Sequence, residues 1–477
     1  MTDSLDSWRI KFGSPVLARR MLSADNKCSP LVLEDCWPIN TSLTLNSLLK
    51  KENRVLLKTE RMRLTHTNRL ERNSMAETAA SKPHDMSAST RISHQAAALS
   101  GYLRSVGEKY FPPSALKSLR SFSSGEVAQI VGVSDGYLRQ LSLDGLGPLP
   151  EIGNGGRRSY TLKQVNALRN YLAIARPREA LGFDPGRQGT DKLQIITVAN
   201  FKGGSAKTTT AIYLAQGLAL NGYKVLAIDL DPQASLSAMF GYQPEFDIPE
   251  NTTLYGAIRY DEHRRPMREV VRETYFDGVS LVPGNLELME FEHQTPRAMM
   301  DRKARGHELF FRRVASAIDQ VANDYDVVVI DCPPQLGYLT MGALNAATSM
   351  LVTVHPQMVD IASMSQFLLM TSDLMSIIEE AGGKLNYDFI RYVVTRHDPR
   401  DVPELEIVGL LRNLFSGDVL KATAWKSTAI ANAGLTKQSL FELPRGAFGR
   451  TVYDRALESV NAVNTEIIDM IKGVWGR

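Results

Sequence analysis

The chain has few cysteines and no long uninterrupted apolar run. Cys28, Cys36 and Cys332 are its three cysteines among 477 residues, which is too few for a disulfide framework. No stretch approaches the roughly 20 consecutive apolar residues of a membrane span, and the first six residues lack the basic and apolar regions of a signal peptide. These absences argue against disulfide-stapled secreted proteins and multispanning membrane proteins, and they predict a cytoplasmic location.

Charge is distributed unevenly along a chain that is long enough for two to four domains. Hydrophobic residues make up 43% of it, which is enough for buried cores. Residues 1–74 and 75–182 each carry a net charge of +5, from 13 basic and 8 acidic residues, whereas residues 183–477 carry −7. Because basic patches gain DNA affinity by releasing counterions from phosphates, the amino-terminal part is predicted to face nucleic acid.

The most informative segment is a loop rich in small residues between an apolar run at 193–198 and a helix-like run at 209–220. Gly203 and Gly204 allow the backbone to approach a phosphate closely, and the start of the helix presents unpaired N–H groups. Lys202 and Lys207 add positive charge on either side of the glycines. The ordinary phosphate-loop pattern nevertheless fails, because Phe201 and Ala206 occupy its two glycine positions.

Two further apolar runs end in carboxylates. In residues 224–233 the apolar run is followed by Asp229 and Asp231, which share one face of the predicted strand. In residues 326–334 the apolar run is followed by Asp331, at the end of a second strand. In a parallel sheet such ends meet at one edge, beside the phosphate loop. Magnesium prefers hydroxyl and carboxylate oxygens, so the predicted metal ligands are Thr208, Asp229 and Asp331.

The basic region ahead of this sheet contains a predicted helix-turn-helix. Residues 124–141 form a helix, a turn at Gly132 and a second helix capped by Ser134, with apolar residues spaced to pack the helices together. Residues 155–161 resemble the wing of MerR-type winged domains. The predicted DNA contacts are Tyr137, Arg139 and Gln140 in the second helix and Arg157 and Arg158 in the wing.

The run from Lys202 to Thr209, together with the two carboxylate-ended strands, resembles the deviant phosphate loop of the ParA/MinD superfamily of dimerising ATPases. The resemblance implies an α/β fold, a P-loop doubly wound, mostly parallel sheet with helices on both faces, preceded here by a small, mainly α winged helix-turn-helix domain. It implies that Lys202 reaches the nucleotide of the other subunit and that Asp231 orients the attacking water, which makes Lys202, Lys207 and Asp231 the catalytic residues. Most members have glycine where this chain has Ala206, so a negative φ is expected there.

The same resemblance assigns further sites and partners. It implies ATP and Mg²⁺ as cofactors, homodimers, no stable membrane association and a cytoplasmic, nucleoid-associated protein. The implied nucleotide-binding residues are Lys202, Gly203, Gly204, Ser205, Ala206, Lys207, Thr208 and Thr209 in the loop, with Thr395 and Arg396 after a later strand. Nonspecific DNA contacts are implied for Lys426, Arg445 and Arg450.

Within the superfamily, residues 75–477 are most similar to the RepA partition proteins of repABC plasmids. That similarity implies plasmid partition stimulated by a ParB-type centromere-binding partner, and autorepression of the operon through specific operator binding. The predicted organisation is a flexible segment and a helix at 75–120 available for dimerisation, the winged domain at 121–182 and the ATPase at 190–477.

Some alternatives remain open at this stage. Residues 1–74 are either a disordered basic arm that touches DNA or an extension ahead of the natural start, since Met75 opens a stretch typical of a bacterial amino terminus. A transcription repressor that uses an inactive ATPase fold for dimerisation is a rival function. A MinD-like membrane-associated ATPase is another, although the charges of the last helix suit a packed helix better than a lipid surface. The iron–sulfur branches of the superfamily need paired cysteines, and only Cys332 lies in the ATPase region.

Overall fold

The computed structural model describes residues 87–110, 117–244, 246–300 and 308–477, so the expectations for residues 1–74 lie outside the described residues. The chain divides into two units at Tyr102, and helix α2 (Ala88–Tyr110) crosses that division. Helix α2 begins at Ala88, within the range 75–120 for which the sequence predicts a flexible segment and a helix. Ser87 caps the helix, because its hydroxyl accepts a hydrogen bond from the amide of Thr90, 3.2 Å away.

Four α-helices and a small sheet form the module ahead of the large sheet. Helices α3 (Ser124–Val131) and α4 (Asp135–Leu143) are joined by a turn in which Gly132 has a φ of +79°. The Ser134 hydroxyl accepts a hydrogen bond from the amide of Tyr137, which is the predicted cap. Strands β1 (Phe122–Ser123), β2 (Glu151–Ile152) and β3 (Arg158–Tyr160) pair antiparallel in the order β1-β3-β2, and α5 (Leu162–Ala175) and α6 (Ala180–Phe183) follow.

A seven-stranded sheet forms the centre of the remaining region, in the order β10-β9-β4-β8-β5-β7-β6. All neighbours pair in parallel except the edge strand β6, which is antiparallel to β7. The strands are β4 (Gln194–Ala199), β5 (Val225–Asp229), β6 (Arg272–Glu273), β7 (Val279–Val282), β8 (Val327–Asp331), β9 (Ser349–Val354) and β10 (Phe389–Val394). This mostly parallel sheet confirms the predicted fold class.

Helices cover both faces of the sheet because side chains on a strand alternate between its faces. In β4, Ile196 and Val198 pack into the hydrophobic core beneath α7 (Lys207–Leu220) and α17 (Arg450–Val474). Ile195 and Ala199 of the same strand pack into the opposite core. Strands buried on both faces are therefore rich in apolar residues, as the sequence predicts for β4, β5 and β8, although β4 also buries Gln194 and Thr197.

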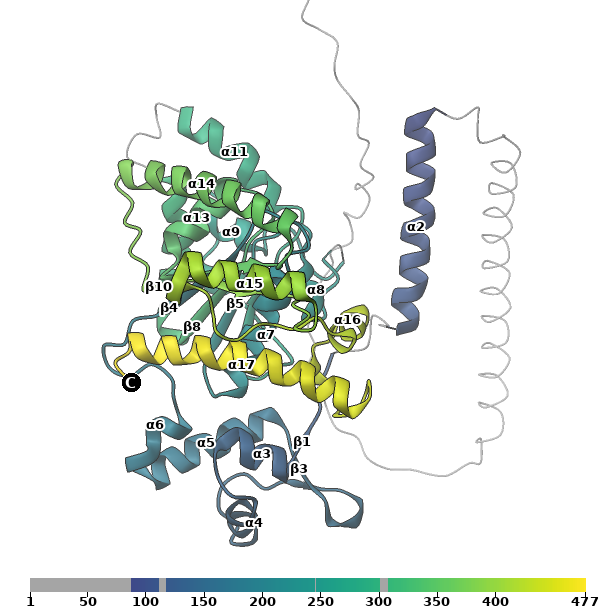
Figure 1. Ribbon diagram of the computed structural model, residues 1–477, viewed down its shortest axis with the longest axis vertical. Helices are drawn as coiled ribbons and strands as arrows, with labels where there is room; N and C mark the ends of the chain where they lie inside the picture. Colours follow the sequence, from purple (N-terminus) through teal and green to yellow (C-terminus); the bar gives the residue numbers. More distant parts are fainter. Residues whose placement is uncertain (1–86, 111–116, 245, 301–307) are drawn as a thin grey trace, which may run out of the picture. The chain divides into compact units, whose positions relative to one another are not determined.

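The opposite core contains residues of the helices from α9 to α15, among which α11, α13 and α14 can be followed in Figure 1. The remaining α-helices are α8 (Ser235–Met239), α9 (Leu254–Ile258), α10 (Met267–Val270), α11 (Leu288–Met300), α12 (Arg313–Asp319), α13 (Tyr338–Ala346), α14 (Met358–Glu380), α15 (Val402–Phe415) and α16 (Thr428–Leu435). Short 3₁₀ segments at Asn154–Gly156, Pro177–Glu179, Phe310–Arg312, Ala322–Asp324, Ser416–Asp418 and Leu440–Glu442 connect them.

Two helices bear on the question of membrane association. The last helix, α17, buries Ile467, Ile468 and Ile471 against the sheet, in agreement with a packed terminal helix. In the described part of the chain, α14 alone is long and apolar enough to cross a membrane. It buries Met364 and Phe367 in the core beside the sheet, as a covering helix does.

A buried arginine and a partly buried lysine attach the amino-terminal module to the sheet region. The Arg169 guanidinium group on α5 donates to the Ile130 carbonyl of α3 (2.7 Å) and to the Leu220 carbonyl at the end of α7 (2.9 Å). Lys117, ahead of the module, forms an ion pair with the buried carboxylate of Glu442 at 2.7 Å. Removing one partner of a buried, hydrogen-bonded pair leaves the other uncompensated, so both anchors are expected to hold the module firmly.

Candidate nucleotide-binding site

The glycine-containing loop lies between the end of β4 and the start of α7, where the sequence predicted a phosphate site. Lys207 is the first residue of α7 and is 6% exposed. Its ammonium group donates to the carbonyl oxygen of Lys202, 3.2 Å away, and so spans the loop. Burial lowers the pKa of Lys207, while the nearby carboxylate of Asp331 opposes that shift. A buried amine at a helix start provides the positive charge that phosphate binding requires.

Ala206 does not have the expected negative φ. Its φ is +69°, in the left-handed region, and it immediately precedes α7. The loop needs this conformation because Ala206 reverses the chain from the loop into the helix and its carbonyl accepts the bond from Thr210. A side chain in this region is strained, so the alanine retains the shape of the loop at a cost in free energy.

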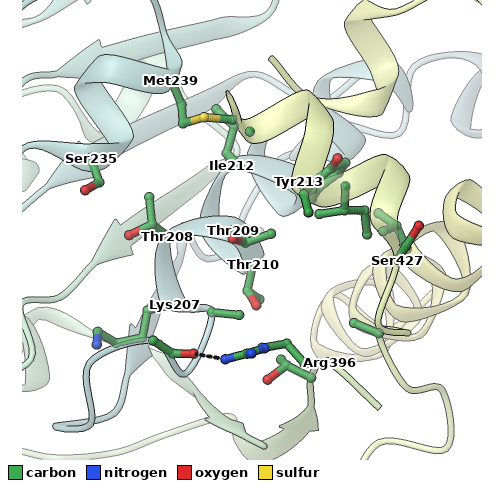
Figure 2. A pocket seen from close by; sticks show the side chains of 18 of the residues that line it. Lys207, Thr208, Thr209, Thr210, Ile212, Tyr213, Ser235, Met239, Arg396 and Ser427 are labelled. Atoms are coloured by element: carbon green, nitrogen blue, oxygen red, sulfur yellow. Dashed lines mark hydrogen bonds between the residues drawn. The ribbon is translucent and has the colours of Figure 1, made fainter. Parts of the chain in front are cut away.

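Side chains from two neighbouring strands hold the far side of the loop. The Thr353 hydroxyl donates to Ser205 Oγ (3.1 Å), and the Thr395 hydroxyl donates to the Ser205 carbonyl oxygen (3.1 Å). The Arg396 guanidinium group donates to the carbonyl oxygen of Gly204, also at 3.1 Å (Figure 2). Thr395 and Arg396, which follow β10, therefore fix the backbone of the loop, and they also line the cavity beside it.

The carboxylate of Asp331 has an unusual environment at the end of β8. The residue is fully buried, and neither of its oxygens has a hydrogen-bond partner among the described residues. Burial, reinforced by the negative charge of Asp229, raises the pKa of Asp331 well above its ordinary value, while Thr208 and Lys207 act in the opposite direction. An unpaired buried carboxylate is costly unless a cation joins it, so this carboxylate fits a metal ion.

Asp229 is also buried, but its oxygens are already used. One oxygen accepts bonds from the Ser237 amide (2.8 Å) and the Ser237 hydroxyl (2.7 Å), and the other accepts from the Asp231 amide (3.2 Å). Burial raises the pKa of Asp229, although these three bonds lower it in part. Asp229 thus orders the segment from Asp231 to Ser237, whereas Asp331 has the open oxygens.

A cavity of about 800 Å³ lies against the loop and the first turns of α7 (Figure 2). The predicted residues that line it are Gly203, Gly204, Ala206, Lys207, Thr208, Thr209, Asp231, Thr395, Arg396 and Lys426. Lys202, Ser205, Asp229 and Asp331 are not part of this lining. Lys426, for which the sequence predicts a DNA contact, is exposed and also lines this cavity.

The sequence reasoning did not identify the opposite wall of the cavity. Trp425 and Ser427 precede α16, and Ile430 and Gln438 lie on and after it. Trp425 forms an isolated parallel β-bridge with His397, just after β10, and this contact holds it at the cavity. The only local signal was an isolated tryptophan before a short helix, and that pattern does not indicate a binding site.

The other predicted DNA contacts lie outside the cavity. Arg139, Gln140 and Arg157 are exposed, and Arg158 is half-buried on β3. Tyr137 is half-buried beneath the guanidinium group of Arg176, 4.3 Å from its ring centre, so that Arg176 covers part of the face expected to meet DNA. In the sheet region, Arg450 is exposed at the start of α17, and exposed Arg445 pairs with Asp454 at 2.7 Å.

Comparisons with known proteins identify related sequences and a related fold. A family described as an AAA domain matches residues 193–381. A protein of Rhizobium rhizogenes named as a replication protein A is 52% identical over 81% of this chain and 95% of its own length. SopA of Escherichia coli (strain K12) is 28% identical over 76% of this chain and 92% of its own length. A solved partition protein, 19% identical with a TM-score of 0.56, covers 81% of this chain and 98% of its own and shares the fold. The chain therefore belongs to the ParA/MinD superfamily of P-loop ATPases, together with these replication and partition relatives.

Proposed function

We propose that the protein is an ATP-dependent plasmid partition ATPase that binds Mg²⁺–ATP in the cavity beside α7. Two observations carry the proposal: the buried Lys207 ammonium group at the start of that helix, and the nearby unpartnered carboxylate of Asp331 at the end of β8. A cation and an open carboxylate at a helix start are what a metal-bound polyphosphate needs. Partition relatives that match most of the chain support the biological assignment.

The residues around the cavity would have separate roles in nucleotide binding and hydrolysis. Lys207 and the loop amides would hold the phosphates, and the Thr208 hydroxyl with Asp331 would hold Mg²⁺, which supplies charge neutralisation during phosphoryl transfer. No group of three or more His, Cys, Asp or Glu side chains within the described ranges could hold a metal, so phosphates and waters would complete its shell. Asp231 lines the cavity and would orient the attacking water. Asp229 would keep Asp231 in place through the bond to its amide.

Dimerisation and DNA binding complete the proposal. Lys202 of one subunit would place its charge against the phosphates bound by the other, so hydrolysis would require the dimer. The module at 121–182 would bind an operator through Arg139, Gln140 and Arg157 and repress the operon, while the ATP dimer would bind nonspecific DNA. A ParB-type partner would stimulate hydrolysis. Coupling between such sites typically amounts to about 1–3 kcal/mol.

ATP hydrolysis by the full chain, measured with and without nonspecific DNA, tests the proposal. Slow turnover that DNA stimulates and that Lys202→Ala abolishes is the expected result. The main alternative is an operator-binding repressor built on an inactive ATPase fold, and it predicts specific DNA binding without any turnover. A MinD-like activity predicts that the protein sediments with anionic liposomes when ATP is present.

A further inference from the structure

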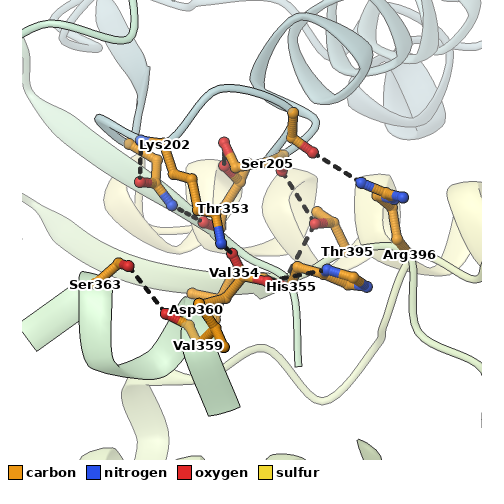
Figure 3. Close-up of polar contacts among 12 residues, drawn as sticks. Lys202, Ser205, Thr353, Val354, His355, Val359, Asp360, Ser363, Thr395 and Arg396 are labelled. Carbon is orange, nitrogen blue, oxygen red and sulfur yellow. Dashed lines mark hydrogen bonds and ion pairs between the residues drawn. The ribbon is translucent and has the colours of Figure 1, made fainter. Parts of the chain in front are cut away.

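The side chain of Lys202 points away from the nucleotide cavity. Its ammonium group forms an ion pair with the carboxylate of Asp360, in the first turn of α14 (Figure 3). The Lys202 side chain is 35% exposed, whereas that of Asp360 is 11% exposed. Lys202 belongs to the nucleotide loop in sequence but is absent from the lining of the cavity. The ion pair therefore keeps the positive charge of Lys202 outside the cavity.

The start of the loop is fixed independently of this ion pair. The Lys202 amide donates to the side-chain oxygen of Asn200 (2.9 Å), and the Asn200 side-chain amide donates to the Thr353 carbonyl oxygen (2.6 Å). These bonds hold the Lys202 backbone whatever its side chain does. The ammonium group can therefore exchange partners without movement of the loop.

Asp360 is held from its other side and cannot follow the lysine. Its second oxygen lies 3.2 Å from Nδ1 of His355, which is itself 11% exposed, and its amide donates to the Gln357 carbonyl oxygen. Nε2 of the same imidazole lies 4.0 Å from the carboxylate of Glu404. Asp360 also occupies the first turn of a helix, where negative charge is favoured. The carboxylate is therefore a fixed anchor, and Lys202 must leave it to reach any phosphate.

We propose that Asp360 is a positioning residue that holds Lys202 in an inactive position, and that breaking this ion pair is part of the cost of forming the hydrolysing dimer. The inference rests on the proposed function, in which Lys202 acts on the nucleotide of a second subunit. In the single subunit the pair keeps the lysine from its own cavity. In the dimer the phosphates of the other subunit replace Asp360 as its partner.

Asp360→Asn tests the inference in the full chain. Loss of the carboxylate charge frees Lys202, so the ATP concentration for half-maximal dimerisation, followed by light scattering, is expected to fall about three- to tenfold. Hydrolysis in the absence of DNA or partner should rise by a similar factor at low ATP. Asp373→Asn makes the same change at an exposed position of α14 and should leave both quantities as in the wild type.

A Lys202→Gln background separates the positioning role of Asp360 from a general effect of Asp360→Asn on folding. With Lys202→Gln present, Asp360→Asn should no longer shift the ATP dependence of dimerisation, because the charge that it releases is absent. If Asp360→Asn folds poorly, His355→Gln keeps the carboxylate, weakens its support and should give a smaller shift in the same direction. Thermal unfolding of each variant identifies misfolded protein.

The two hypotheses fail in different ways. If the wild type dimerises with ATP and hydrolyses it, but Asp360→Asn and His355→Gln leave the ATP dependence unchanged or raise the ATP requirement, the positioning hypothesis is wrong and the proposed function stands. An equal shift with Lys202→Gln present also overturns it. If the wild type neither dimerises nor hydrolyses ATP, both the proposed function and the inference fail.

Discussion

The Arg169 guanidinium group donates to the carbonyl oxygen of Leu220, 2.9 Å away, and so attaches the amino-terminal module to the last turn of α7. The same helix begins at Lys207 in the nucleotide loop. A rigid helix thus has the candidate phosphate site at one end and the module at the other. Such an element provides a physical connection between the two sites.

Replacing Arg169 with Met should destabilise the fold. The side chain is 4% exposed and donates to the carbonyl oxygens of Ile130, Phe183 and Leu220. Methionine fills similar space but leaves these oxygens without that donor, so a loss of about 3 kcal/mol in the free energy of unfolding is expected. Chemical denaturation measures it, with Arg178→Met at an exposed position as the control. Equal stability of the two variants would contradict the anchoring role.

Ala206→Gly should stabilise the protein. Alanine at φ +69° costs about 1–2 kcal/mol relative to alanine in a right-handed conformation, and glycine removes this cost. Glycine also loses more backbone entropy on folding, which destabilises the fold by about 0.5–1 kcal/mol. The expected net gain is about 0.5–1 kcal/mol in the free energy of unfolding, measured by urea denaturation. Ala211→Gly, inside α7, should instead destabilise the fold. A loss of stability in Ala206→Gly would show that the alanine is not strained.

His397 should make stability depend on pH. The side chain is buried, with Nδ1 3.0 Å from the Thr423 hydroxyl, and burial lowers its pKa below the ordinary 6.5 although Glu404 opposes the shift. As pH falls through about 6.5, the unfolded chain takes up the proton first, so stability is lost from there down to the lowered pKa of the folded state. His397→Asn should reduce the drop in melting temperature between about pH 7.5 and pH 5.5. An unchanged drop would assign the pH dependence to other groups.

The sequence predicts the sheet region better than the walls of its site. The ends of β4, β5 and β8 follow from local patterns, because an apolar run followed by glycines or carboxylates indicates a buried strand that ends at the edge of a parallel sheet. The contact of Lys202 with Asp360 and the position of Trp425 depend on the packing of segments far apart in the chain. For Ala206 the residue type predicts a negative φ, whereas the turn from the loop into α7 requires a positive one.

Lys207→Ala and Asp231→Ala should fail at different steps. Lys207 provides a buried charge at the loop, so Lys207→Ala should reduce ATP affinity by about tenfold to a hundredfold or more, measured by titration calorimetry. Asp231 lines the cavity, and Asp231→Ala should bind ATP and accumulate as a dimer that does not turn over. Light scattering combined with a phosphate-release assay separates the two variants. Normal turnover by Asp231→Ala would remove its proposed role in orienting water.

Asp331 and Asp229 should respond oppositely to the same substitution, although both are buried carboxylates at neighbouring strand ends. Asp331 lacks a hydrogen-bond partner among the described residues, so Asp331→Asn removes an uncompensated charge and should leave stability without nucleotide equal or higher. Asp229 accepts bonds from Ser237 and Asp231, so Asp229→Asn should cost about 2–4 kcal/mol.

Magnesium dependence completes this comparison. Asp331→Asn should lose most of the Mg²⁺-dependent gain in melting temperature with ATP, because the open carboxylate oxygens are those that fit the ion. Asp229→Asn should retain that gain on its lower baseline, since its oxygens are occupied within the protein. Thermal unfolding with ATP and with either Mg²⁺ or a chelator measures both variants. If Asp229→Asn alone lost the Mg²⁺ effect, Asp229 would be the direct ligand and Asp331 would need another explanation for its unpaired oxygens.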